Sequence, residues 1–173
     1  QDYLPSNIVV PFWSLGVEEK FYLLAPILLI GLLRLPTHGA RYATLAVLIV
    51  VPLGLRTLTA LANPDVVTYA DFFPIFRSPF HVSFDGLAVG TLCALIYRDR
   101  ARLRWLTEPM VARGLFWAGL APVAGLLLAA PLLDTGVGWF AKTGLQTLLA
   151  LGMGGLVLGA ALGGKVQVEW LGL

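Results

Sequence analysis

This sequence contains few charged residues. Lys, Arg, Asp and Glu make up 13% of its 173 residues, whereas 58% are hydrophobic. A soluble domain carries about 25% charged residues, which cover its outer face. The shortage of charge, together with long uncharged apolar runs, excludes an ordinary soluble domain and predicts a polytopic membrane protein.

Cysteine is almost absent as well. Cys93 is the single cysteine and lies inside an apolar run, which excludes a disulfide framework and a cysteine-based metal cluster. The net charge of +2 does not indicate a nucleic-acid partner, because the basic residues cluster beside apolar runs and so mark membrane orientation. We therefore predict membrane lipids as partners, and neither nucleic acid nor a metal site.

Five apolar segments of roughly 18–22 residues are each long enough to cross a hydrocarbon core of about 30 Å as a helix. They cover residues 14–35, 42–61, 79–97, 114–133 and 143–162. Helices satisfy their own backbone groups in lipid, and the segments do not alternate as barrel strands would. The sequence thus predicts an all-α fold: a polytopic membrane helix bundle with about five transmembrane helices, forming a single membrane domain over residues 1–173.

Loop charge predicts the orientation. The segments "RLPTHGAR" at 34–41 and "RDRARLRWLTEPMVAR" at 98–113 are basic, whereas "ANPDVVTYADFFPIF" at 62–76 is acidic. Since basic loops stay in the cytoplasm, the Gln1 end is expected to be extracytoplasmic and the Leu173 end cytoplasmic. The row Gly155, Gly159 and Gly163 has the four-residue spacing that allows close helix packing in membranes.

The stretch "WSLGVEEKFYLLAP" places two carboxylates where the first apolar segment begins. One interpretation is a well-anchored helix start, in which Ser14 caps the helix and both glutamates face the positive end of the helix dipole. Trp13 and Tyr22 then belong to an interfacial aromatic belt. The alternative is a site, because Ser14, Glu18 and Tyr22 share one helix face and Glu19 adds more charge than a cap needs.

Further polar residues fall at the same depth in the second and third segments. We expect Ser78 to cap the third helix with Pro79 at its first position, so that His81 and Asp85 share a face. Asp85 would then lie deeper than a cap residue and need a partner or water. Arg56 could instead snorkel to the interface, and His81 could be an ordinary interfacial residue. The sequence predicts one polar layer near the outer interface, made of Glu18, Glu19, Arg56, His81 and Asp85.

"WSLGVEEKFYLLAPILL" resembles the acyltransferase 3 family of bacterial integral membrane acyltransferases, which typically carries W-S-L-S-V-E-E-Q-F-Y at this place. Gly16 and Lys20 depart from that pattern. "FDGLAVGTLCAL", which begins at Phe84, resembles a second block of the family, and "WLGL" at the end resembles the approach to a later one. The resemblance covers most of this chain and the middle and later part of a domain of roughly ten helices, each of about 20 residues.

The resemblance implies an O-acyltransferase of the bacterial inner (plasma) membrane. It would move an acyl group, typically acetyl, from cytoplasmic acyl-CoA, the donor substrate, to a hydroxyl of an extracytoplasmic carbohydrate or glycolipid. Glu18 and Glu19 would support catalysis. The substrate would be bound by Trp13, Ser14, Tyr22, Arg56, His81 and Asp85. We interpret the sequence as an internal fragment, and we expect it to be inactive by itself because the family's proposed catalytic histidine would precede Gln1.

Two other classes compete with this interpretation. A fragment of a secondary transporter would also place ionisable residues in helices interrupted by Pro and Gly, although its site is expected near the midplane of the bilayer. A purely structural membrane subunit would leave the carboxylate of Asp85 unexplained.

Overall fold

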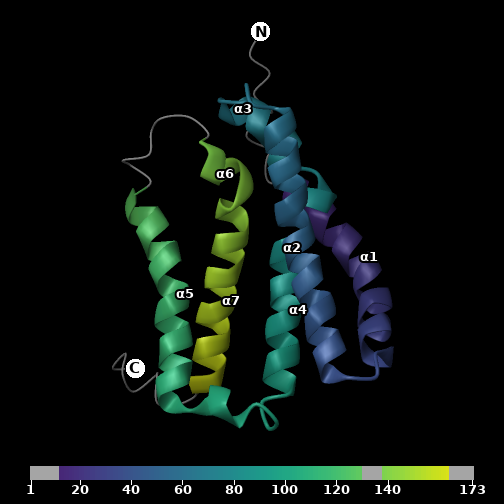
Figure 1. The fold of residues 1–173 in the computed structure, drawn as a ribbon, viewed down its shortest axis with the longest axis vertical. Coiled ribbons are helices and arrows are strands. Elements are labelled where there is room, and N and C mark those ends of the chain that lie inside the picture. Colours follow the sequence, from purple (N-terminus) through teal and green to yellow (C-terminus); the bar gives the residue numbers. More distant parts are fainter. Residues whose placement is uncertain (1–11, 130–137, 164–173) are drawn as a thin grey trace. The chain divides into compact units, whose positions relative to one another are not determined.

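The computed structural model describes residues 12–129 and 138–163, with side chains from Glu19 onward except those of Tyr69 and Ala129. Every regular element in these ranges is a helix, which confirms the all-α prediction (Figure 1). The chain divides into two compact units. Unit 1 comprises Gln1–Ala88 with Thr135–Gln146, and unit 2 comprises Val89–Asp134 with Thr147–Leu173.

Unit 1 begins with α1 (Phe12–Arg34) and α2 (His38–Ala62), which contact each other. The short connection is stabilised from both sides. The Thr37 side chain caps α2 by accepting a hydrogen bond from the Ala40 amide at 3.1 Å. Arg41 Nη2 donates to the carbonyls of Leu33 and Leu35, each at 3.1 Å, and so satisfies acceptors that the end of α1 leaves open.

Short elements follow α2 in the same unit. These are α3 (Tyr69–Phe72), the π-helical turn η1 (Phe73–Arg77), the 3-10 turn η2 (Phe80–Val82) and α6 (Trp139–Thr143). Phe76 is fully buried and its ring stacks on Phe72, with 5.4 Å between centroids. A small core of Ala60, Val66 and Phe76 fastens the turns to the end of α2.

The predicted third helix, 79–97, is wrong at its start, because α4 spans Asp85–Arg98. Pro79 has extended backbone angles, φ −71° and ψ 133°, and the chain makes the turn η2 before α4 begins. Ser78 therefore follows η1 instead of capping α4. At about 1.5 Å per residue, the 14 residues of α4 extend roughly 21 Å, less than a bilayer core. Ser14 likewise lies inside α1 and does not cap it.

Unit 2 contains the rest of α4, the 3-10 turn η3 (Arg104–Thr107), α5 (Pro109–Ala129) and α7, which spans Leu145–Gly163 and enters this unit at Thr147. The backbones of α5 and α7 approach so closely that a Cβ on Gly159 would lie 2.5 Å from the Phe116 nitrogen. The glycine row that the sequence predicts to pack closely does so at Gly155 and Gly159.

Three of the described helices are long and apolar enough to cross a membrane: His38–Ala62, Pro109–Leu128 and Leu145–Gly163. Large apolar side chains are exposed along the long helices, among them Leu23, Ile27, Val50, Leu58, Leu127, Leu128 and Val157. Such faces are unfavourable in water and suit lipid, so the helices indicate a membrane protein. Five membrane crossings remain a prediction.

Candidate functional site

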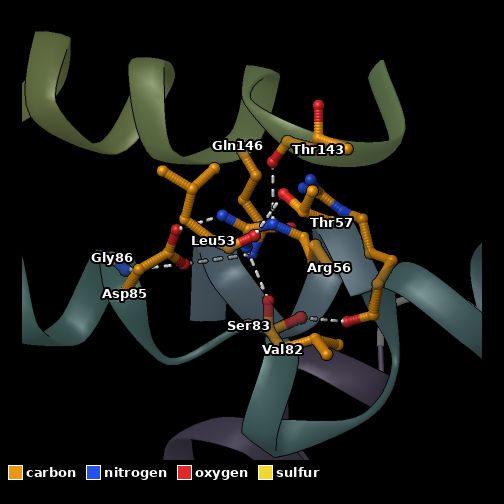
Figure 2. A network of polar contacts seen from close by, with 10 residues as sticks. Leu53, Arg56, Thr57, Val82, Ser83, Asp85, Gly86, Thr143 and Gln146 are labelled. Carbon is orange, nitrogen blue, oxygen red and sulfur yellow. Dashed lines mark hydrogen bonds and ion pairs between the residues drawn. The ribbon is translucent and has the colours of Figure 1, made fainter. Parts of the chain in front are cut away.

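An ion pair inside unit 1 joins α2 to the start of α4 (Figure 2). Arg56 Nη2 lies 2.8 Å from Asp85 Oδ2, and the side chains of both residues are buried, with 1% and 0% of their surface exposed. A charge buried without a partner costs several kcal/mol, so each residue needs the other. The pair is the deepest concentration of charge among the described residues of unit 1.

Arg56 binds two backbone carbonyls in addition to Asp85. Its Nε donates to the Thr143 carbonyl at 2.9 Å, and its Nη1 donates to the Val82 carbonyl at 2.6 Å. Thr143 is the last residue of α6, so its carbonyl is one of those that a helix end leaves without an internal donor. The guanidinium of Arg56, which α2 carries, therefore binds η2, α4 and α6, each through a different nitrogen atom.

The carboxylate of Asp85 lies in the first turn of α4, where the helix dipole favours negative charge. Its Oδ1 accepts from the Gly86 amide at 3.1 Å and from Gln146 Nε2 at 3.5 Å. Both oxygens of the carboxylate are thus bound. Asp85 combines the roles of helix-start anion and counterion of Arg56, which explains why a carboxylate is stable at a fully buried position.

Local hydrogen bonds fix the turn that presents the Val82 carbonyl to Arg56. The Val82 amide donates to the Pro79 carbonyl at 3.2 Å, and Ser83 Oγ donates to the Arg77 carbonyl at 2.6 Å. Ser83 is itself buried. The extended conformation at Pro79 turns the chain so that η2 can end directly beside α4.

The charged groups of Arg56 and Asp85 are paired with each other and hydrogen-bonded to further groups. Removing one partner of a buried pair destabilises a protein by about 3–5 kcal/mol, because the other charge stays buried. The pair therefore links α2, η2, the start of α4 and the end of α6 within unit 1.

The structure brings together Arg56 and Asp85 from the predicted polar layer. His81 is exposed on η2 and shares no helix face with Asp85, so the spacing argument for that residue was wrong. Glu19 and Tyr22 are exposed on α1. The side chains of Trp13, Ser14 and Glu18 lie outside the described residues, and their approach to the pair stays a prediction.

Three partners in this site were missed by the sequence reasoning. Val82 and Thr143 act through backbone carbonyls, which leave no trace in a sequence. Gln146 had a signal, since it is a polar amide inside an apolar segment. Lys142 is also buried, at 5% exposure, and its Nζ donates to the Pro64 carbonyl at 3.2 Å beyond the end of α2.

No group of three or more His, Cys, Asp or Glu side chains within the described ranges could hold a metal ion. Comparisons of this chain with protein-family models, with curated proteins and with solved structures found no match.

Proposed function

We propose that this chain belongs to a membrane O-acyltransferase, which transfers an acyl group from acyl-CoA to a hydroxyl of an extracytoplasmic carbohydrate or glycolipid. In this proposal the chain crosses a bacterial inner membrane about five times, with "WSLGVEEK" on the outer side. The proposal rests on the resemblance of two sequence blocks to the acyltransferase 3 family.

One structural observation gives the second block a physical role. Asp85 is the second residue of that block, and it is fully buried and bonded to Arg56 through a 2.8 Å contact. A buried carboxylate in an apolar protein is unfavourable unless an ion pair and hydrogen bonds compensate its loss of hydration. The opening motif on α1 belongs to the same unit, and α1 contacts α2, which carries Arg56. The opening motif and the start of the second block therefore lie in the same compact unit.

The chemistry assigns different work to the two sets of residues. The acceptor oxygen attacks the thioester carbonyl, the new C–O bond forms, and the C–S bond breaks as the hydroxyl proton passes to a base and finally to the coenzyme A sulfur. Carboxylates such as Glu18 and Glu19 can accept hydrogen bonds from sugar hydroxyls. Arg56 and Asp85 are engaged with one another and with the backbone, so we assign them to positioning.

The test is acyl transfer by the protein made from its complete gene in membrane vesicles supplied with radiolabelled acetyl-CoA. Label is expected in the carbohydrate fraction, and Glu18→Gln should lose most of it while inserting normally. Glu108→Gln, which removes an exposed carboxylate in the α4–α5 connection, is the matched control and should retain activity. If Glu18→Gln transfers acyl groups as well as the wild type, the role of Glu18 is only to interact with the helix dipole, and it has no part in catalysis. Uptake of a solute without acyl transfer would favour the transporter interpretation.

A further inference from the structure

The connection between α4 and α5 in unit 2 is rich in arginine. Residues 98–113 contain five arginines against two carboxylates, Asp99 and Glu108. Arg100, Arg102 and Arg104 are exposed. We refer to residues 98–105, which hold four of the five arginines and end at Trp105, as the basic turn.

The basic turn has a defined backbone. The amides of Arg102 and Leu103 both donate to the Asp99 carbonyl, at 2.9 and 3.1 Å, and the Leu106 amide donates to the Leu103 carbonyl at 2.9 Å. Leu106 is buried and anchors the turn η3, which includes Arg104 and Trp105, to unit 2. The arginines are therefore presented from a fixed backbone.

Only some of the arginines in the basic turn have a partner within the protein. Arg98 Nε lies 3.3 Å from Asp99 Oδ1, and the Arg100 guanidinium lies over the Tyr97 ring, 4.4 Å from its centroid. The side chains of Arg102 and Arg104 make no hydrogen bond or ion pair with any described residue. Two exposed guanidinium groups thus remain available to an external anion.

Exposed apolar side chains lie next to these arginines. Trp105 is 60% exposed and directly follows Arg104, and Met110 is 86% exposed in the first turn of α5. α5 is one of the three helices long and apolar enough to cross a membrane. A soluble anion would need only the guanidinium groups, whereas an exposed tryptophan at the start of a membrane helix fits the headgroup region of a bilayer.

We propose that the basic turn binds anionic phospholipid headgroups, with Arg102 and Arg104 on lipid phosphates and Trp105 inserted at headgroup depth. Each arginine near an anionic surface contributes about 1 kcal/mol, which is roughly a fivefold change in affinity. This inference does not depend on acyl transfer, because it concerns the membrane around the protein.

The test uses the tryptophan as a reporter. The chain is reconstituted in phosphatidylcholine vesicles that contain a small equal fraction of brominated phosphatidylglycerol or of brominated phosphatidylcholine. The quenching of the wild type minus that of Trp105→Phe isolates the signal of one tryptophan among five. We expect the anionic brominated lipid to quench more strongly, and Arg102→Gln with Arg104→Gln to lower its relative affinity roughly 25-fold.

The matched control removes the same charge elsewhere. Lys20→Gln with Arg34→Gln changes two exposed residues of α1 and should leave the preference at Trp105 intact. High salt should abolish the preference in the unmodified protein, which tests the proposal without any arginine variant. Equal quenching by both lipids at low salt would overturn the proposal. So would loss of the preference on adding coenzyme A or inorganic phosphate, which would identify a site for a soluble anion.

Discussion

A side chain added at Gly119 should push α5 and α7 apart, although a glycine-to-alanine change normally strengthens a helix. A Cβ there would meet the Gly152 carbonyl oxygen and the Leu156 nitrogen far inside contact distance, and would lie 2.9 Å from the Gly155 carbonyl carbon. All three neighbours are backbone atoms of α7. They cannot rotate away as a side chain could, so relief requires that the helices separate.

Two opposing effects set the magnitude. Replacing glycine by alanine in an open helix position stabilises it by about 0.5–1 kcal/mol. Forcing an extra methyl group into a closely packed contact costs about 1–3 kcal/mol. The upper part of that range applies, because the added Cβ would meet backbone atoms and not a flexible side chain. Gly119→Ala should therefore lower the free energy of unfolding by about 1–2 kcal/mol net.

Gly125 supplies the control on the same helix, because a Cβ there has nothing within 4 Å. Gly125→Ala should leave stability unchanged or raise it by up to about 1 kcal/mol. Both variants can be unfolded reversibly in mixed micelles and followed by circular dichroism. Equal changes in the free energy of unfolding would refute the close approach of α5 and α7, as would a stabilising effect of Gly119→Ala.

Three further perturbations test other parts of the structure. Asp85→Ala should cost about 3–5 kcal/mol, and the double variant with Arg56→Ala should cost clearly less than the two single changes added together; additive losses would mean that the pair is not coupled. Arg41→Met should lower stability by about 1–2 kcal/mol and weaken hydrogen-exchange protection at the end of α1, and unchanged protection would contradict its capping role. In intact cells, a thiol reagent that does not cross membranes should label Asp65→Cys but not Arg102→Cys, and the reverse pattern would invert the proposed orientation.

The sequence predicted the long helices well, because their apolar length is a local property. The segments predicted at 42–61 and 143–162 correspond to α2 and α7 within a few residues at each end. The third segment failed at Pro79. Its apolar run continues through residues whose backbone is extended or turned, and hydropathy does not register that difference. α6 was not predicted, because all of it except Thr143 falls in the connection before the segment at 143–162.

The candidate site was predictable only in its charged members. Two opposite charges in apolar segments have strong reason to pair, so Arg56 and Asp85 could be expected together. The carbonyls of Val82 and Thr143 became acceptors only through the folded path of the chain, over sequence separations of 26 and 87 residues. The sequence argument placed His81 and Asp85 on one face of a single helix. In the structure, His81 lies in the turn η2 and α4 begins only at Asp85, so the two residues share no helix face.

The numbers of residues that separate Arg56 from its partners also determine the order in which those partners are synthesised. Asp85 follows Arg56 by 29 residues, whereas Thr143 follows it by 87. At about 5–20 residues per second, the ribosome delivers the carboxylate roughly 1–6 s after the arginine and the α6 carbonyl only after about 4–17 s. A guanidinium that has entered lipid can thus be neutralised early, but its last backbone partner arrives late. This order of synthesis allows the ion pair between α2 and α4 to form before the carbonyl of α6 exists.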